Sequence, residues 1–387
     1  MKMDEMLQRE DFYRIFEETM TEYFKKVLNK ECTVEVVDSA VKEKIVLFAG
    51  LNRVITKKPS RDIVRHIYKA FNINDNLVKN LAAKAYIFLH LLAKGKTADK
   101  GIRLSDPTLF TDDMAIVPGN KKIRINYYSN KISDLIVKEG FSDRYFQNEV
   151  KFRTENRFDF IVPILDHGEI WYRETLLDGR CLARITDKAI CERSQERVVE
   201  CLKQLNRTYS SFLSGKEYAK ALKDSISDKL EKVKTEKSDV DFDFEKIREL
   251  IKRLSDRVSE MDAVPLTLSH GDMQSGNIIV QDDGSIYIID WETYATRSIW
   301  YDVTTLFLFT RRYNRWKSII QNRYTKKLQD LIYRIDDARN MDIDQVIAVL
   351  LLEDLEFRLT DVLMIPGDRG CCGLNSFINE ISEEGLL

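Results

Sequence analysis

The sequence predicts an α+β protein in which a small five-stranded antiparallel lobe is followed by a larger, helical lobe. Two observations lead to this prediction. Between residues 113 and 178, apolar side chains recur at every second position in five short runs, which is typical of strands. After residue 179, the apolar spacing changes to three and four, as expected for helices, apart from one hairpin. A chain of 387 residues has room for two or three domains.

The first 111 residues precede this lobe and are predicted to form a mainly helical extension. An apolar face with helical spacing runs from Phe12 to Leu28, and helical patterns return over residues 61–71 and 77–93. Residues 33–37 and 44–48 could form short strands. No chemical motif occurs in this extension, so its helices are expected to form core or to dock to a protein or a membrane.

The strand-rich lobe is predicted to cover residues 112–178. Pro118-Gly119-Asn120 and Tyr128-Ser129-Asn130 favour turns between its first three strands. A helix is predicted over residues 142–155. The five predicted strands cover residues 114–117, 122–128, 132–138, 160–165 and 170–176.

The helical lobe is predicted to cover residues 179–387. Helices are expected over residues 187–213, 298–333 and 344–363. Residues 214–262 carry many charges of both signs and are either a solvated helical pair or a mobile linker, with a break near residues 236–243.

The composition excludes several classes of protein. With 61 basic and 63 acidic residues, the net charge is −2, which argues against general nucleic-acid binding. The six cysteines form no C-x-x-C pair and the four histidines are spread widely, so reduced thiols and no zinc site are expected. The charged start of the chain is no signal peptide, and the longest aliphatic run is too short for a transmembrane segment. We therefore expect a cytoplasmic protein.

The most informative segment begins with His270-Gly271-Asp272 and continues to Asn277, and Asp290 follows thirteen positions later. Two short apolar runs, Asn277–Val280 and Ser285–Ile289, flank the turn sequence Gln281-Asp282-Asp283-Gly284, which predicts a hairpin. A polar loop thus enters the hairpin and a carboxylate lies at its exit. Each residue alone could be a cap or turn residue. Together they can present one carboxylate to a hydroxyl, and an amide oxygen plus a second carboxylate to magnesium.

This segment resembles the catalytic core of the aminoglycoside/choline phosphotransferase family, whose members are relatives of the protein kinases. The resemblance covers roughly residues 112–365 and implies a two-lobed protein-kinase-like fold. It implies that Asp272 is the catalytic base and that Asn277 and Asp290 bind Mg²⁺. His270 and Asp302 are expected to support the loop. Glu292 is expected to contact metal or substrate, or to form a surface salt bridge.

The resemblance also implies residues that bind the nucleotide. Lys138 stands where the family has its strand lysine, and Glu149 on the next helix is its expected partner. Gly119 and Asn120 would lie over the phosphates, although a plain hairpin turn explains them equally well. The hinge at Glu174, Thr175 and Leu176 is expected to hold the base through backbone groups.

The leading hypothesis is an ATP- or GTP-dependent, Mg²⁺-dependent phosphotransferase that acts on a hydroxyl of a small molecule, such as a sugar, an aminoglycoside or a choline-like alcohol. Alternatives are a kinase of an envelope glycan or lipid-linked sugar and a nucleotide-binding pseudokinase scaffold. A protein kinase is disfavoured because Gly271 and Trp291-Glu292 replace its arginine and Phe-Gly. A basic group in the helical lobe weakly favours an anionic or sugar-like acceptor; its members are Arg297, Arg311, Arg312, Arg315 and Lys317.

Overall fold

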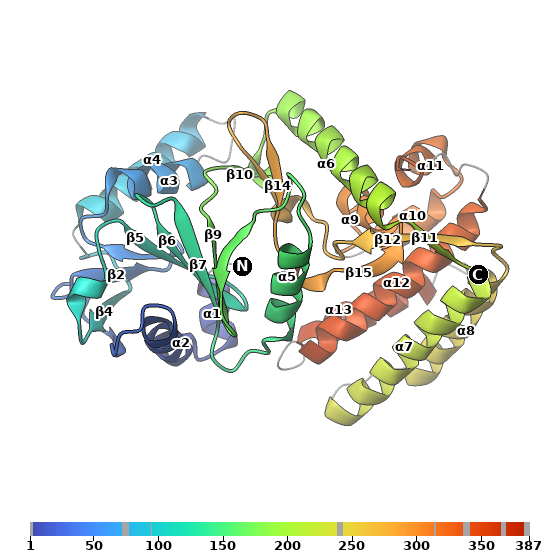
Figure 1. Ribbon diagram of the computed structural model, residues 1–387, viewed down its shortest axis with the longest axis horizontal. Coiled ribbons are helices and arrows are strands. Elements are labelled where there is room, and N and C mark those ends of the chain that lie inside the picture. Colours follow the sequence, from blue (N-terminus) through green and yellow to red (C-terminus); the bar gives the residue numbers. More distant parts are fainter. Residues whose placement is uncertain are drawn as a thin grey trace. The chain divides into compact units, whose positions relative to one another are not determined.

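The computed structural model describes residues 3–71, 77–93, 95–237, 243–312, 315–335, 341–364 and 369–382. The chain folds into two compact units (Figure 1). The first consists of Met1–Ser194 and Ile278–Glu292, and the second of Gln195–Asn277 and Thr293–Leu387. The predicted hairpin therefore belongs to the first unit, whereas the loop before it belongs to the second.

The first unit is built on a nine-stranded sheet with the order β1-β4-β2-β3-β5-β6-β7-β9-β8. Every neighbouring pair in it is antiparallel. The strands are β1 Val34–Val37, β2 Ile45–Phe48, β3 Arg53–Thr56, β4 Lys100–Leu104, β5 Met114–Pro118, β6 Lys122–Tyr127, β7 Ile132–Val137, β8 Ile164–His167 and β9 Trp171–Thr175.

Residues 112–178 contain five strands, β5 to β9, but four strands from the first 111 residues join the same sheet, so the lobe extends beyond its predicted start. Val54 of β3 pairs with Ile116 of β5, so the sheet continues across the expected boundary at residue 111. The α+β class itself is confirmed. Strands β1 and β2 lie where short strands were considered possible.

Strand β8 begins four residues later than expected. Phe160, Ile161 and Val162 are buried but lie outside the sheet. Ile161 instead forms a parallel bridge with Ile288, and Phe160 accepts a hydrogen bond from the Ile288 N–H. This apolar run therefore packs against the hairpin, which sequence periodicity alone does not show.

Helices cover both faces of the sheet (Figure 1). The helices α1 Met3–Arg9 and α2 Phe12–Lys26 pack on one face, where Phe16 and Phe24 meet Ile116 and Ile136. The helices α3 Arg61–Phe71, α4 Leu77–Leu92 and α5 Arg144–Glu155 pack on the other face. Side chains alternate along a strand, so a residue and its sequence neighbour face different helices.

The predicted hairpin is confirmed. Strands β13 Ile278–Val280 and β14 Ile286–Ile288 pair antiparallel, with Ile279 opposite Tyr287. The short strand β10 Arg180–Cys181 pairs with β13 and completes a three-stranded sheet. Gly284 has a φ of +81°, a value that glycine adopts without strain, which explains the turn.

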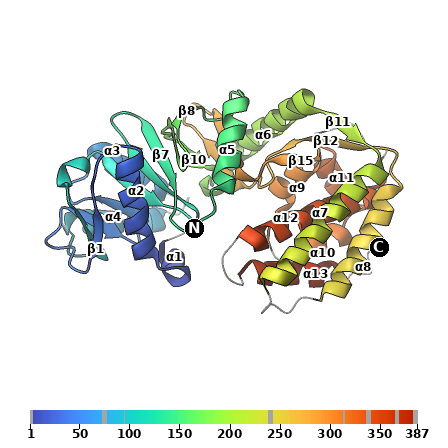
Figure 2. The same ribbon diagram turned by 60° about the horizontal axis from the view of Figure 1, so that its bottom comes forward.

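The second unit is helical around a small sheet of three strands, β11 Ser211–Leu213, β12 Val264–Ser269 and β15 Ala295–Ser298 (Figure 2). Helix α12 is buried along most of its length and lies in the largest apolar core, whereas α7 and α8 each bury one face there. The elements are α6 Lys188–Tyr209, which begins in the first unit, β11 Ser211–Leu213, α7 Gly215–Glu236, α8 Phe244–Ser259, β12 Val264–Ser269, β15 Ala295–Ser298, α9 Tyr301–Leu308, α10 Arg315–Gln321, α11 Lys326–Ile332, α12 Ile343–Met364 and α13 Arg369–Ser382.

Two expectations for this unit are resolved. Residues 214–262 are a packed helical pair rather than a linker in their described parts, because Ile226 and Leu230 of α7 meet Ile247 and Leu250 of α8 in the core. The helix expected over residues 187–213 ends at Tyr209, because Ser211–Leu213 form strand β11 and pair with β12.

Two expectations from composition concern thiols and membrane spans. Cys32, Cys181, Cys191 and Cys201 are unbridged thiols, and the side chains of Cys371 and Cys372 lie outside the described residues. None of the described helices is both long enough and apolar enough to cross a membrane.

Candidate active site

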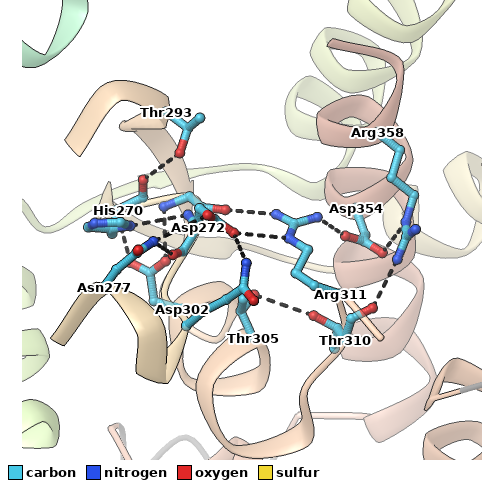
Figure 3. Close-up of polar contacts among 12 residues, drawn as sticks. His270, Asp272, Asn277, Thr293, Asp302, Thr305, Thr310, Arg311, Asp354 and Arg358 are labelled. Atoms are coloured by element: carbon cyan, nitrogen blue, oxygen red, sulfur yellow. Dashed lines mark hydrogen bonds and ion pairs between the residues drawn. The ribbon is translucent and has the colours of Figure 1, made fainter. Parts of the chain in front are cut away.

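The loop that follows β12 is held by a buried aspartate. Asp302 on α9 accepts hydrogen bonds from Ser269 Oγ at 3.0 Å, from the His270 N–H at 2.7 Å and from the Gly271 N–H at 3.1 Å. The Thr293 hydroxyl donates to the His270 carbonyl at 3.1 Å. These bonds hold the backbone on the N-terminal side of Asp272 (Figure 3).

Gly271 is required by the shape of this loop. Its φ is +85°, and a Cβ atom at this position would lie 2.3 Å from the Thr293 carbonyl oxygen. Any other residue would be strained and would clash with backbone. The Nδ1 atom of buried His270 accepts a hydrogen bond from the Asp272 N–H at 3.2 Å. Both neighbours thus orient Asp272.

The carboxylate of Asp272 remains partly exposed while its neighbours bind it. The Gln274 side-chain amide donates to Oδ1 at 2.6 Å. The Asn277 side-chain amide donates to the Asp272 carbonyl at 2.9 Å and to Oδ2 at 3.2 Å. The nitrogen of Asn277 is thereby committed to the loop, and its amide oxygen is the atom that can serve as a metal ligand.

An arginine from outside the loop also holds it. Arg311 donates from Nη2 to the Gly271 carbonyl at 2.7 Å, and its Nε lies 3.7 Å from Asp272 Oδ1. Its Nη1 is paired with buried Asp354 on α12, which also accepts from Arg358 Nε at 2.9 Å. Figure 3 shows Arg311 between the two aspartates. This arrangement joins the loop to the core of the second unit.

The first unit carries a second polar cluster at the exit of the hairpin. Lys122 Nζ on β6 lies 2.6 Å from Glu149 Oε2, 2.9 Å from Asp290 Oδ1 and 3.1 Å from Glu292 Oε2. Lys121 Nζ lies 2.9 Å from Glu292 Oε1. Asp290 has a φ of +67°, which is uncommon for a residue other than glycine and tolerated by aspartate.

The charges in this cluster stabilise one another. Burial by itself lowers the pKa of Lys122, but the carboxylates of Asp290, Glu149 and Glu292 outweigh burial and hold that pKa well above its usual value. Burial by itself raises the pKa of Glu292, but Lys122 and Lys121 hold it below its usual value. The lysine and this carboxylate are therefore both charged near neutral pH.

The same carboxylates have the chemistry of a magnesium site. Glu149, Asp290 and Glu292 each present an oxygen, and the three oxygens lie within 4.8 Å of one another. Carboxylate oxygens are the ligands that Mg²⁺ prefers. These residues have oxygen ligands suited to a divalent cation, and in this structure the Lys122 ammonium group contacts all three carboxylates.

The expected pairing of Lys138 with Glu149 is wrong. Lys138 is fully buried, pairs with Glu10 and donates to the Asn120 carbonyl at 3.2 Å. The reason is strand alternation. Val137 packs on the α5 side of the sheet, so the next residue turns to the α2 side, whereas Lys122 lies opposite Val137 and faces α5.

The residues expected to form the phosphate loop and the hinge make hydrogen bonds within the first unit. The Gly119 N–H donates to the Lys122 carbonyl at 3.0 Å, as in a hairpin turn. Glu174 is buried and accepts from Arg124 and Arg153. The Leu176 N–H donates to the Lys131 carbonyl at 2.8 Å. The residues on both sides of Thr175 therefore make hydrogen bonds within this unit.

Sequence reasoning missed Lys122, and it missed the contact of Arg311 with the catalytic loop. Lys122 and Arg124 alternate with apolar residues on β6, and Glu149 and Arg153 are spaced by four on α5. These two patterns of complementary charge could have predicted that β6 and α5 face each other. For Arg311 the sequence held no signal beyond its charge, because its partner Asp354 lies forty-three positions away.

Comparison with known proteins assigns the segment that contains the loop and the hairpin to a family of enzymes. Residues 161–330 match the phosphotransferase enzyme family. This match confirms the family resemblance and the predicted class of enzyme, a phosphotransferase. No curated protein shows significant similarity to the chain.

Three of the solved structures that are similar to the chain are described as kinases or as a kinase family protein. An ethanolamine kinase from Plasmodium vivax is 16% identical with a TM-score of 0.49, covering 85% of this chain and 96% of that one. A choline/ethanolamine kinase family protein from Mesorhizobium loti is 14% identical with a TM-score of 0.48, covering 72% and 91%. A choline kinase from Streptococcus pneumoniae is 11% identical with a TM-score of 0.43, covering 70% and 90%. The assignment of the phosphotransferase segment rests on the family match.

Proposed function

We propose that this phosphotransferase moves the γ-phosphoryl group of ATP or GTP to a hydroxyl group of a small molecule in the cytoplasm. The observation that carries the proposal is the loop in which Asn277 binds the Asp272 carboxylate and then leads directly into the hairpin that ends at Asp290. Phosphoryl transfer depends mainly on positioning and charge stabilisation, which such a rigid loop provides.

Each polar residue has a part in the proposed reaction. Asp272 orients the acceptor hydroxyl and accepts its proton as the oxygen–phosphorus bond forms. Asn277 and Asp290 hold Mg²⁺ through one oxygen each, with Glu292 and Glu149 close enough to Asp290 to complete or support the site. Bound Mg²⁺ supplies charge neutralisation on the phosphate oxygens.

The first unit is proposed to bind the nucleotide. Lys122 takes the part that was expected of Lys138, because its ammonium group stands among the carboxylates at the hairpin exit. Backbone groups around Gly119 and Asn120 are proposed to contact phosphate, and backbone groups near Thr175 to contact the base. The side chain of Glu174 is already paired with two arginines and is not proposed to contact the base.

The acceptor is proposed to be a small alcohol rather than a molecule selected by negative charge. Two of the arginines that favoured an anionic acceptor are committed to the protein. Arg311 binds Gly271 and Asp354, and buried Arg297 donates to the Thr293 carbonyl at 3.1 Å.

The proposal is tested by direct detection of the product. The chain would be incubated with Mg²⁺ and ATP labelled in the γ-phosphate, together with pools of sugars, amino alcohols and aminoglycosides, and new phosphomonoesters would be followed by ³¹P NMR. A phosphomonoester that requires Mg²⁺ and an acceptor pool is the expected result. Tight binding of Mg²⁺ and ATP without transfer to any hydroxyl would instead support a nucleotide-binding scaffold.

Replacement of Lys122 by methionine is expected to weaken the binding of Mg²⁺ and ATP by about 10–100-fold, because charged hydrogen bonds of this kind contribute about 1.5–3 kcal/mol. Lys138→Met is the matched control, because its pairing with Glu10 lies on the other face of the sheet. Isothermal titration measures both affinities, and circular dichroism checks folding. Lost affinity in Lys138→Met with normal affinity in Lys122→Met would restore the original assignment.

Replacement of Asp290 by asparagine is expected to raise the Mg²⁺ concentration that gives half-maximal activity by at least about tenfold, since a charged oxygen ligand becomes neutral. Activity would be measured at fixed ATP over a Mg²⁺ titration. Asp282→Asn, in the exposed turn of the same hairpin, is the control and should leave the Mg²⁺ requirement unchanged. Equal Mg²⁺ requirements in Asp290→Asn and the native chain would exclude Asp290 as a ligand.

A further inference from the structure

Helix α4 of the first unit exposes an unusual amount of apolar surface. Among the described residues, eleven large apolar side chains are exposed, and six of these belong to α4. Leu81, Phe88, Leu89 and Leu92 are 55–61% exposed. They recur at the spacing that places them along one side of a helix, whereas Ile87 is buried in the core on the other side. A surface helix normally shows the reverse pattern, with its polar residues outward.

The sequence that contains this apolar stripe is strongly basic. Residues 57–98 contain nine basic and two acidic residues, which gives a local charge of +7 in a chain whose total is −2. From Leu77 to Ala98 the sequence has four lysines and no acidic residue. Exposed Lys84 borders the stripe on the helix. The basic residues are Lys57, Lys58, Arg61, Arg65, Lys69, Lys79, Lys84, Lys94 and Lys96.

We propose that the stripe formed by Leu81, Phe88, Leu89 and Leu92 inserts into the surface of an anionic membrane, with the surrounding lysines and arginines bound to lipid headgroups. At 16 residues the helix is about 24 Å long, too short to span a bilayer but suited to lie in its interface. Lysine side chains at the edge of such a stripe extend their charge towards the headgroups while their methylenes stay in apolar surroundings.

Charge decides between a membrane and the other possible occupants. A second copy packed symmetrically on this stripe would bring two surfaces of the same positive charge together, which is unfavourable. A nucleic acid needs cations in the middle of its binding surface, whereas here apolar side chains fill the middle and Lys84 lies at the edge. An anionic bilayer complements both features.

The inference does not depend on phosphoryl transfer, because binding of the chain to vesicles can be measured without catalytic turnover. In combination with the proposed function, it favours acceptors whose hydroxyl is presented at a membrane surface, as in a lipid-linked sugar. A chain that binds vesicles but transfers no phosphate would refute only the proposed function, and a chain that transfers phosphate but never binds vesicles would refute only this inference.

The test is co-sedimentation of the full chain with vesicles of phosphatidylcholine alone and with a quarter of phosphatidylglycerol. Binding to the anionic vesicles that weakens with added salt is expected. The double variant Phe88→Gln, Leu92→Gln should bind at least tenfold more weakly, and Lys84→Gln should bind about fivefold more weakly. The matched control is Leu165→Gln with Phe212→Gln, two apolar residues of similar exposure elsewhere, and it should bind as the native chain does.

Three results would overturn the inference. The first is native-like vesicle binding by Phe88→Gln, Leu92→Gln, and the second is no vesicle binding of the native chain at low salt. The third is a dimer in light scattering that dissociates in this double variant, in a chain that does not bind vesicles, which would assign the stripe to a second copy. Since all four substituted apolar residues are exposed, melting curves should match that of the native chain, and this confirms that the variants are folded.

Discussion

Replacement of Asp272 by asparagine is expected to lower the rate of phosphoryl transfer by about 10²–10⁴-fold, the range found when a positioned acid–base group is lost. Asparagine keeps the size of the side chain and can still accept the hydrogen bond from Gln274, so the loop should keep its shape. It cannot accept a proton from the acceptor hydroxyl. Steady-state kinetics with an acceptor found in the product screen would measure kcat and the KM for ATP.

The kinetic pattern separates this role from a structural one. The KM for ATP should change little, because Asp272 is proposed to act on the acceptor side of the reaction. Asp256→Asn on the exposed side of α8 is the control, and native kinetics are expected for it. A kcat for Asp272→Asn within a factor of a few of the native value would rule out Asp272 as the catalytic base.

Replacement of Asp354 by alanine is expected to lower the free energy of unfolding by about 3–5 kcal/mol, the usual effect of removing one partner from a buried ion pair. Asp354 is 1% exposed and accepts from Arg311, Arg358 and the Trp316 indole N–H. Its loss removes the buried carboxylate that both guanidinium groups share, and the remaining carboxylate near Arg311, that of Asp272, is more distant and partly exposed. Urea denaturation followed by circular dichroism measures the effect, with exposed Asp228→Ala on α7 as the control.

The pH dependence of this effect follows from the pKa of Asp354. Burial by itself raises that pKa, but Arg358 and Arg311 outweigh burial and hold it below its usual value. A carboxyl group whose pKa is lowered on folding stabilises the protein above its unfolded pKa of about 3.9, and this contribution is lost as the pH falls towards the folded pKa. The difference in stability between the native chain and Asp354→Ala should therefore be complete at pH 7 and shrink below about pH 4. A difference that is constant from pH 7 to pH 3 would contradict the ion-pair account.

Local sequence patterns predicted the parts of the fold that depend on neighbours in the chain. The hairpin from Ile278 to Ile288 follows from two alternating apolar runs around an Asp-Gly turn, and α5 follows from its helical spacing. Strand pairing at long range did not follow. Nothing near Val54 indicates that β3 would pair with β5, and the short apolar run at Phe160 could equally join a sheet or pack against another element.

The same distinction applies to the candidate site. The loop residues from His270 to Asn277 are close in sequence, and their mutual contacts were expected. The pairing of Lys138 with Glu149 was predicted wrongly because the face of a strand to which a terminal residue turns depends on register, which becomes known only with the pairing of Lys122 and Val137. The contact of Arg311 with the loop depends on the packing of α12, which no local pattern encodes.

The central claim is that Asn277 and Asp290 hold the same metal ion beside the triphosphate. The most direct test is a double-mutant cycle on the affinity of the ATP complex for Mn²⁺, measured by electron paramagnetic resonance in the native chain, Asn277→Ala, Asp290→Asn and the double variant. Two ligands of one ion should show a coupling energy of about 0.5–3 kcal/mol, so that the double variant loses less affinity than the two single losses combined. Strictly additive losses, or unchanged Mn²⁺ affinity in either single variant, would contradict the shared magnesium site.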